Sequence, residues 1–397
     1  MDGTSNMTSQ QDLAAIGKAL LGPEAVQTIW RVAKKVMDAS DAPTAFPHNT
    51  KPTTYTYVYT PSTWWTSGFF PGSVWECYER SLKMPSPVPK EDLLRAARKW
   101  ELGMEVEKTN TRTHDLGFMI MPSFFRDLEL TGNQEALQVI VEAANSLASR
   151  WSETTQCIRS WDKTTNKEYS FMSKDTDFLV IIDNMMNLDL LYVAAERTGN
   201  KELARIATTH AESTLKYHVR EDFSTYHLIV LDTKTGAHKH SLTHQGYAHK
   251  SCWSRGQAWA LYGFATVYKY THDSKFLDAA KKLARYFCSR VANDGTVYWD
   301  FDAPRPCEWD ASAAMIATSG MLLIQQLDPT ADFLSDIIKI LKRIISGGMG
   351  GEDVILQHST VNNHENAHSR SADTGLVYAD YYFLETGNRM LDMGLIK

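Results

Sequence analysis

The stretch AERTGNKELARIATTHAESTL (residues 195–215) decides the fold, because it ends one helix and begins the next within three residues. Gly199 suits the left-handed conformation that often closes a helix, and Asn200 can cap the helix that follows. Similar punctuation recurs around Thr131, Thr271, Asp328 and Thr386. The unit of about 60 residues is too long for the familiar short solenoid repeats and fits a helical hairpin with a connecting loop.

Hydrophobic periodicity predicts twelve helices, or six hairpins. Their expected positions are 23–40, 67–82, 90–108, 112–130, 133–150, 176–197, 200–217, 254–270, 274–292, 309–327, 330–346 and 370–386. Segments 178–195 and 256–268 are apolar nearly all round, as helices packed on several sides must be, whereas 204–218 has a charged face. The second helix of each pair therefore faces the interior of a closed ring.

These patterns predict an all-α fold, an (α/α)6 barrel that forms one catalytic domain over residues 23–397. Residues 1–22 are expected to be a polar N-terminal segment, partly disordered. Two inserts, at 151–175 and 218–253, should lie on the rim that carries the inner-helix starts, and residues 41–66 form a third irregular stretch. Within them we expect short strands at YSFM (169–172) and TYHLIVLD (225–232), and a turn at TKTG (233–236).

Composition excludes several classes of protein. The formal net charge is −6 and no basic block interleaves with aromatic residues, so a nucleic-acid partner is not expected. No apolar stretch approaches the roughly 18 residues of a membrane span, and the start of the chain does not resemble a signal peptide, which predicts a soluble, cytoplasmic protein. The five cysteines form no CxxC pair and the histidines no strong metal spacing, so we expect neither metal nor cofactor.

Polar residues and tryptophans gather where the inner helices should begin. Asp183 follows the apolar run FLVII, so its carboxyl group is desolvated unless it lines a cavity, and desolvation raises a carboxyl pKa toward that of a general acid. Asp115 holds the corresponding place one hairpin earlier, and two carboxyls that face one cavity can divide the roles of acid and base. The structural alternative is helix capping or salt bridging for Asp183, and capping of the helix at 112–130 for Asp115.

Other polar side chains at this rim are candidate substrate ligands. The forked guanidinium of Arg255 can clamp a carboxylate, and His114, His227 and Gln245 can bind hydroxyls or a carboxylate. Structural pairing is the alternative for each. The chain is rich in aromatic residues, and the tryptophans chosen as candidates for stacking on a sugar ring are Trp65, Trp161 and Trp259.

Five motifs occur in an order that resembles the unsaturated glucuronyl hydrolases, glycoside hydrolase family 88. They are WTSGFFPG (65–72), HDLGF (114–118), DNMMN (183–187), SRGQAW (254–259) and YADYYFLE (378–385). The resemblance implies an (α/α)6 barrel that hydrates the vinyl ether of a nonreducing-end Δ4,5-unsaturated glucuronate on lyase-generated oligosaccharides. It assigns acid/base catalysis to Asp183, an essential second carboxylate to Asp115, and substrate contacts to Trp65, Trp161, His227, Gln245, Arg255 and Trp259.

Two further activities stay open. The related unsaturated rhamnogalacturonyl hydrolases share the barrel and the hydration chemistry. A sugar 2-epimerase on an α-toroid would need histidines as its acid and base, and His114 is the one histidine at an inner-helix start that fits. The sequence predicts a monomer or homodimer, and it leaves open the linkage preference, the sulfate tolerance and the roles of Ser369, Arg370 and Ser371.

Overall fold

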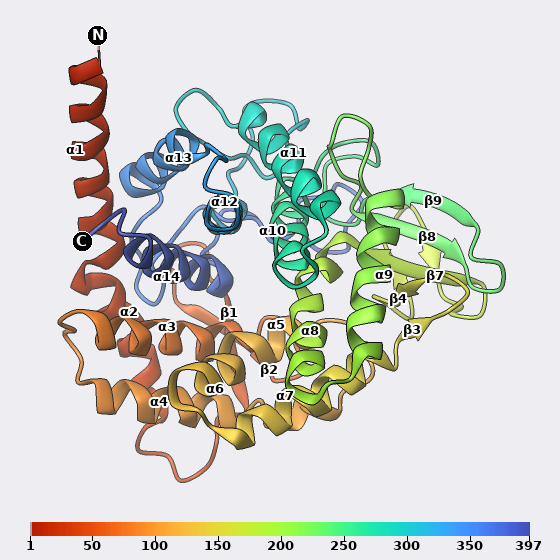
Figure 1. The fold of residues 1–397 in the computed structure, drawn as a ribbon, viewed down its shortest axis with the longest axis horizontal. Helices are drawn as coiled ribbons and strands as arrows, with labels where there is room; N and C mark the ends of the chain where they lie inside the picture. The colour runs from red at the N-terminus through yellow and green to blue at the C-terminus, as the bar shows by residue number, and fades with distance from the viewer. Residues whose placement is uncertain (1) are drawn as a thin grey trace.

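The computed structural model describes residues 2–397, and its helices form two concentric rings (Figure 1). The inner ring consists of α3 (Phe69–Lys83), α5 (Leu116–Ile120) with α6 (Arg126–Thr131), α8 (Leu188–Thr198), α10 (Ser254–Thr271), α12 (Ala311–Leu327) and α14 (Val377–Asp392). The outer ring consists of α2 (Pro23–Ala33), α4 (Lys90–Leu102), α7 (Gln134–Ala148), α9 (Lys201–Tyr217), α11 (Ser274–Arg290) and α13 (Leu334–Gly347). The predicted α/α toroid is confirmed.

Burial separates the two rings as the sequence predicts. In α10 every residue from Ser254 to Val267 is buried, and α12 is buried from Ala311 to Ile324. In α9 only one face is buried, through residues such as Leu203, Ile206 and His210. The inner helices pack on several sides, and the outer helices cover them with one apolar face each.

The repeated Thr-Gly-Asn punctuation works as a double cap. Gly132 and Gly199 end α6 and α8 in the left-handed conformation, with φ of 75° and 74°. The side chains of Asn133 and Asn200 then accept a hydrogen bond from the backbone N–H two residues later, at the start of α7 and α9. Helices α6 and α8 thus turn into their outer neighbours α7 and α9 without a linker.

The fifth copy of the punctuation does not end a helix. Gly387 lies inside α14, which continues to Asp392 instead of ending near residue 386 as predicted. A Cβ at Gly387 would lie 2.8 Å from Nη2 of Arg80, so the glycine makes room for a buried guanidinium. Asn388 accepts a hydrogen bond from Nε of Arg80 at 2.8 Å instead of capping a helix.

The largest departure from the prediction lies at 176–197. Residues Asp177–Ile181 form strand β7, Ile182–Asn187 form a 3-10 turn, and only Leu188–Thr198 is α-helix. Strand β7 pairs antiparallel with β8 (Leu228–Asp232), which pairs with β9 (His238–Leu242). The run FLVII is apolar on both faces because each side of this sheet has its own small core, so its pattern also fits a buried strand.

Other boundaries also move. The helix expected at 370–386 begins at Val377, because residues before it pair with neighbouring segments through Ser359–Thr374 and Asn49–Leu376 bridges. The helix expected at 112–130 begins at Leu116 and contains a π-turn at Met121–Phe125. The helices expected at 23–40 and 90–108 end early and continue as 3-10 turns, Lys34–Val36 and Glu105–Thr109.

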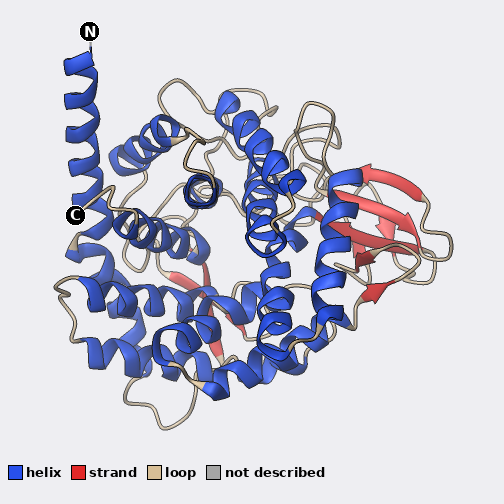
Figure 2. Ribbon diagram, viewed as in Figure 1, coloured by secondary structure: helices blue, strands red, loops and turns tan. Residues whose placement is uncertain are grey.

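Short strands occupy the irregular inserts (Figure 2), and those at 170–171 and 228–232 fall within the predicted segments 169–172 and 225–232, whereas the others were not predicted. They are β1 (Ala45–Thr50), β2 (Tyr57–Pro61), β3 (Trp151–Ser152), β4 (Cys157–Ile158), β5 (Thr164–Thr165) and β6 (Ser170–Phe171). Helix α1 (Asp2–Leu21) spans the N-terminal segment, and its last turns are held by buried Ile16 and Leu20. Met1 lies outside the described residues, and the partial disorder of residues 1–22 stays a prediction.

The double caps yield a test of stability. Replacing Asn200 with alanine removes the side-chain acceptor of a helix N-terminus, and we expect the free energy of unfolding to fall by about 1 kcal/mol. Urea denaturation measures this loss. Lys201→Ala, at the exposed first position of the same helix, is the control and should change stability by no more than a few tenths of a kcal/mol.

Candidate active site

Asp183 and His227 are brought together by the register of two strands. Ile181 of β7 lies opposite Leu228 of β8, and the N–H of Ile182 donates to the carbonyl of His227 at 3.0 Å. Asp183 follows Ile182 in the 3-10 turn directly after β7, and its Oδ2 lies 3.6 Å from Nε2 of His227. The strand that the sequence reading took for helix is therefore the element that positions the predicted catalytic carboxyl.

Burial gives Asp183 the pKa of a group that exchanges protons near neutrality. The residue is only 7% exposed, and burial raises its pKa from 3.8 to about 7. The charge of Arg255 and the polar indole N–H of Trp259 oppose this rise, whereas the negative charge of Asp115 adds to it. Asp183 can hold a proton at neutral pH and can also release it, which suits a group that serves as acid and then as base.

Asp115 lies at the position before α5 but does not cap that helix through its side chain. Its Oδ2 accepts a hydrogen bond from the hydroxyl of Thr113 at 2.7 Å, and its Oδ1 lies 3.3 Å from Nε2 of His114. The capping alternative therefore finds no support. The charge of Asp115 reaches Asp183, so the structure brings the two predicted carboxyls to one site.

The motifs that carry these carboxyls are locked to one another. Asn187 Oδ1 accepts a hydrogen bond from the N–H of Phe118 at 2.9 Å. Gly117 allows this approach, because a Cβ there would lie 2.5 Å from Cα of Asn187. HDLGF and DNMMN thus pack against each other, and the relation of Asp115 to Asp183 is set by the backbone of both segments.

The hydrogen bonds of His227 fix its tautomer. Nδ1 accepts a hydrogen bond from the N–H of His244 at 3.0 Å, so the proton of the neutral ring resides on Nε2, which faces Asp183. Burial and the charges of neighbouring histidines and Arg255 lower the pKa of His227 well below 6.5. His227 is therefore a neutral donor next to the carboxyl. His114 is also fully buried, and burial lowers its pKa.

Both terminal nitrogens of Arg255 already have protein partners in this structure. It is 1% exposed, donates through Nη1 to Oδ2 of Asp310 at 2.7 Å and to the carbonyl of Thr360, and donates through Nη2 to the carbonyl of Val361 at 2.6 Å. The guanidinium lies over the ring of Trp253, with 4.5 Å from Cζ to the ring centroid. Arg255 thus joins the start of α10 to the segment 358–374, and a free carboxylate clamp is not seen.

Gln245 makes a second contact with the same segment. Its Nε2 donates to the carbonyl of Val361 at 2.9 Å, and Nδ2 of Asn362 donates to the carbonyl of His244 at 3.3 Å. Segment 358–374, which we call the lip, is therefore held across the site by Arg255, Gln245 and Asn362.

The three candidate tryptophans occupy different surroundings. Trp161 is partly buried and packs edge-on against His227 and His244, at centroid distances of 6.1 and 5.2 Å. Trp65 is also partly buried and contacts Tyr378 at 5.0 Å. Trp259 is completely buried, so its expected stacking on a sugar finds no support, and it acts on Asp183 from within the core.

Sequence reasoning missed three groups at this site. Asp310 pairs with Arg255, and the ring centroid of Tyr378 lies 5.5 Å from Cζ of the same guanidinium. Asp310 and Tyr378 both lie at the start of an inner helix, which is where the sequence analysis expected functional polar residues. His48 is buried, and its pKa is lowered to about 4 by burial and by the charge of Arg255. Nothing in the local sequence of His48 marks it.

Within residues 2–397, no cluster of three or more His, Cys, Asp or Glu side chains is arranged to hold a metal ion. The same residues include no helix with the length and apolar character needed to cross a bilayer.

The family model described as Glycosyl Hydrolase Family 88 matches residues 31–295. The chain is also 39% identical over 344 residues to the unsaturated glucuronyl hydrolase of Formosa agariphila, with 83% of this chain and 80% of that protein covered. The chain belongs to glycoside hydrolase family 88. As a member of this family it is a glycoside hydrolase, which leaves the epimerase alternative without support.

Other relatives of family 88 agree in sequence and in fold. The unsaturated chondroitin disaccharide hydrolase of Streptococcus pneumoniae is 30% identical, with 84% of each chain covered. A crystal structure of an unsaturated glucuronyl hydrolase specific for heparin superposes with a TM-score of 0.83 at 32% identity, covering 96% of this chain and 98% of that one. The two-ring fold of this chain is therefore the fold of that hydrolase.

The raised pKa of Asp183 makes stability depend on pH with a definite sign. The folded protein keeps the proton up to about pH 7, whereas the unfolded chain releases it near 3.8, so the wild type loses stability as pH rises between these values. Asp183→Asn carries a neutral group at all pH values. We expect this variant to be more stable than the wild type above pH 7 by a few kcal/mol, and equal to it below about pH 4.

Urea denaturation across this pH range measures the difference. Asp278→Asn, on the exposed face of α11, is the matched control. A difference between Asp183→Asn and wild type that is constant with pH would contradict a raised pKa.

Proposed function

We propose that this family 88 member is an unsaturated glucuronyl hydrolase that removes the nonreducing-end Δ4,5-unsaturated glucuronic acid from lyase-generated oligosaccharides. The observation that carries the proposal is the buried Asp183, whose pKa is raised to about 7 beside a neutral His227 and close to Asp115. A vinyl ether must be protonated on carbon before water can add to it. A carboxylic acid that is protonated at neutral pH supplies that proton.

The proposed reaction returns Asp183 to its starting state. The acid transfers its proton to C4 of the double bond, and positive charge develops at C5 and the ring oxygen. The Asp183 carboxylate then takes a proton from the water that adds at C5. The resulting hemiketal opens by breaking the bond from C5 to the ring oxygen, and collapse at C1 releases the remaining sugar and a keto uronic acid.

The neighbouring groups support both steps. The Nε2–H of His227 faces Oδ2 of Asp183 and can steady the carboxylate when the proton has left. The charges of Arg255 and Asp115 act on Asp183 in opposite directions and keep its pKa near neutrality. Asp115, held by Thr113, is the group that orients C4 or the attacking water.

In this proposal the sugar contacts residues on the exposed rim of the barrel. Trp65, Trp161 and Gln245 are partly exposed and lie around the site, so they can touch the sugar without a change of the core. The starts of α10, α12 and α14 meet at Arg255, Asp310 and Tyr378, and their partial positive charge suits the substrate carboxylate.

We further propose that residues 23–397 form a single catalytic domain. Residues from Ala25 to Ile396 share one main hydrophobic core, which supports this assignment, and Ile16, Leu20 and Leu21 of α1 pack into the same core.

The activity is tested with unsaturated disaccharides made by lyases from hyaluronan, chondroitin, heparin and gellan, and with lyase-made pectin fragments. Loss of the ultraviolet absorbance of the double bond reports hydration. We expect the wild type to consume glucuronate substrates, and Asp183→Asn to lose at least about 10³-fold in kcat because its amide donates no proton to carbon.

Asp278→Asn is the control for this substitution and should retain full activity. Turnover of the pectin fragments alone would replace the proposal with an unsaturated rhamnogalacturonyl hydrolase. Undiminished activity of Asp183→Asn would remove Asp183 from the mechanism.

Asp115 gives an independent test of the electrostatics. Since the charge of Asp115 helps to raise the pKa of Asp183, Asp115→Asn should move the alkaline limb of kcat against pH toward lower pH, in addition to reducing kcat. The residual activity of the variant is measured across the pH range. Asp162→Asn, a change of a rim carboxylate that pairs with Arg150, is the control and should leave the limb in place.

If the alkaline limb of kcat against pH does not shift in Asp115→Asn, the charge of Asp115 does not influence the pKa of Asp183.

A further inference from the structure

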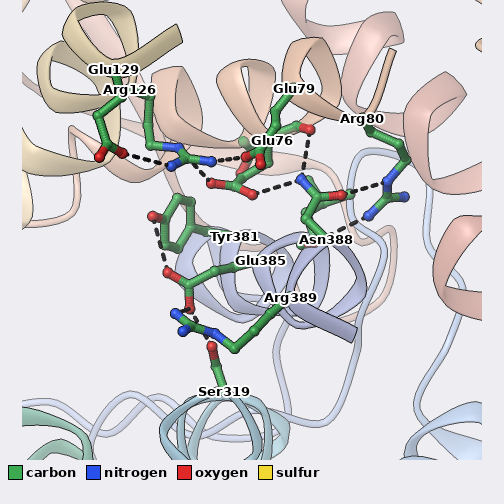
Figure 3. Close-up of polar contacts among 12 residues, drawn as sticks. Glu76, Glu79, Arg80, Arg126, Glu129, Ser319, Tyr381, Glu385, Asn388 and Arg389 are labelled. Carbon is green, nitrogen blue, oxygen red and sulfur yellow. Dashed lines mark hydrogen bonds and ion pairs between the residues drawn. The ribbon is translucent and has the colours of Figure 1, made fainter. Parts of the chain in front are cut away.

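Arginine side chains make two kinds of internal contact in this barrel. Figure 3 shows the first kind, in which Arg126 pairs with carboxylates, with Nε 3.2 Å from Glu76 and Nη1 3.1 Å from Glu129. None of the predicted catalytic or substrate-binding residues takes part in these pairs. Arg150, like Arg255, makes the second kind, because its donors are directed mainly at main-chain carbonyls beside the site.

The guanidinium of Arg150 is fully used by protein acceptors. The residue lies two positions after the end of α7 and is only 8% exposed. Its Nε donates to the carbonyl of Arg159 at 2.8 Å, and its Nη1 donates to the carbonyl of Thr111 at 2.7 Å. Its Nη2 donates to the carbonyl of Ser160 at 3.2 Å and to Oδ1 of Asp162 at 3.0 Å. All three nitrogens therefore have partners, and three of the four acceptors are main-chain carbonyls.

Two of these contacts hold the segment that carries Trp161, since both of its neighbours in sequence bind Arg150. The same segment is joined to strand β7. The N–H of Ser160 donates to the carbonyl of Leu179 at 2.8 Å, and Oγ of Ser160 accepts from the N–H of Ile181 at 2.9 Å. Trp161 also forms a β-bridge with Leu179. The place of the tryptophan ring is thus set by Arg150 together with the strand that leads to the DNMMN motif.

The third carbonyl belongs to the segment that carries Asp115. Thr111 lies four residues before Asp115, in the irregular stretch between the 3-10 turn Glu105–Thr109 and α5. Burial lowers the pKa of Arg150, and the charges of Asp162 and Asp115 oppose this effect. The guanidinium therefore acts on the Asp115 segment both through a hydrogen bond and through attraction between charges.

We propose that Arg150 is a positioning residue for the hydration reaction, which holds the segments of Asp115 and Trp161 at a fixed separation. The inference rests on the proposed function. Because its nitrogens are occupied by protein acceptors, Arg150 acts on the sugar through these two segments. The planar guanidinium presents its donors in a rigid fork, so one side chain fixes several carbonyls relative to one another. Lysine carries the same charge on a single nitrogen and cannot span the same set of acceptors.

Kinetics of Arg150→Lys on the unsaturated disaccharides test the proposal. We expect kcat to fall by about 10- to 100-fold, because small displacements of a catalytic group are costly, and KM to rise several-fold, because the ring of Trp161 is displaced. In a Trp161→Ala background, Arg150→Lys should change KM by less than about twofold. In an Asp115→Asn background, it should lower kcat much less than in the wild type, since residues that act as a unit are not additive.

Hydrogen exchange followed by mass spectrometry reads the same role without substrate. In Arg150→Lys the amides of residues 111–115 and 159–162 should exchange faster than in the wild type, and those of α10 should not change. Arg95→Lys, a change of an exposed arginine that pairs with Asp92 on α4, is the matched control and should alter neither kinetics nor exchange. Circular dichroism verifies that the variants are folded. Arg150→Gln, which keeps one amide donor and loses the charge, is a second variant for the same measurements.

Three results would overturn the proposal. They are effects of Arg150→Lys that multiply with those of both Trp161→Ala and Asp115→Asn, unchanged exchange in the two segments, and a uniform rise of exchange over the whole chain, which indicates a general loss of stability. A wild type that hydrates none of the unsaturated disaccharides would instead remove the proposed function. The exchange experiment would still decide whether Arg150 holds the two segments, so the two failures are distinguishable.

Discussion

A carboxyl group kept away from water is the constraint on which the active site depends. Desolvation alone would hold Asp183 protonated too firmly for it to act again as a base. The buried charge of Arg255 and the indole of Trp259 reduce that effect, while Asp115 increases it. Because these opposing contributions come from different inner helices, the pKa of Asp183 is a property of the closed ring and not of the DNMMN motif alone.

The closed ring follows from local rules that are legible in the sequence. A left-handed glycine followed by a capping asparagine ends one helix and begins the next, and Gly132 and Gly199 have open space where a side chain would stand. Only backbone conformation is required there, so the pattern is recognisable without tertiary information. Gly387 has the same neighbours in sequence but a different reason, since it makes room for Arg80, and that reason cannot be read from one segment.

The sequence identified the residues of the site, but it did not predict the elements and contacts that hold them in place. Asp183, Asp115 and His227 were identified and do lie together, because residue type and position at an inner-helix start carry that information. The strand β7 was missed, since an apolar run of five residues fits a buried strand as well as a buried helix. The partners of Arg255 were missed for another reason: Thr360 and Val361 are more than a hundred residues away, and carbonyl groups leave no mark in a sequence.

Arg255 has two roles, because it lowers the pKa of Asp183 and also holds the lip through hydrogen bonds. The guanidinium that moderates the acidity of Asp183 also holds the carbonyls of Thr360 and Val361. If the lip lifts to admit a sugar, those bonds break and the electric field at Asp183, the proposed catalytic carboxyl, changes in the same event. The pKa of Asp183 and the entry of the sugar through the mouth of the barrel are then coupled. The protonation of Asp183 would change whenever the lip opens or closes.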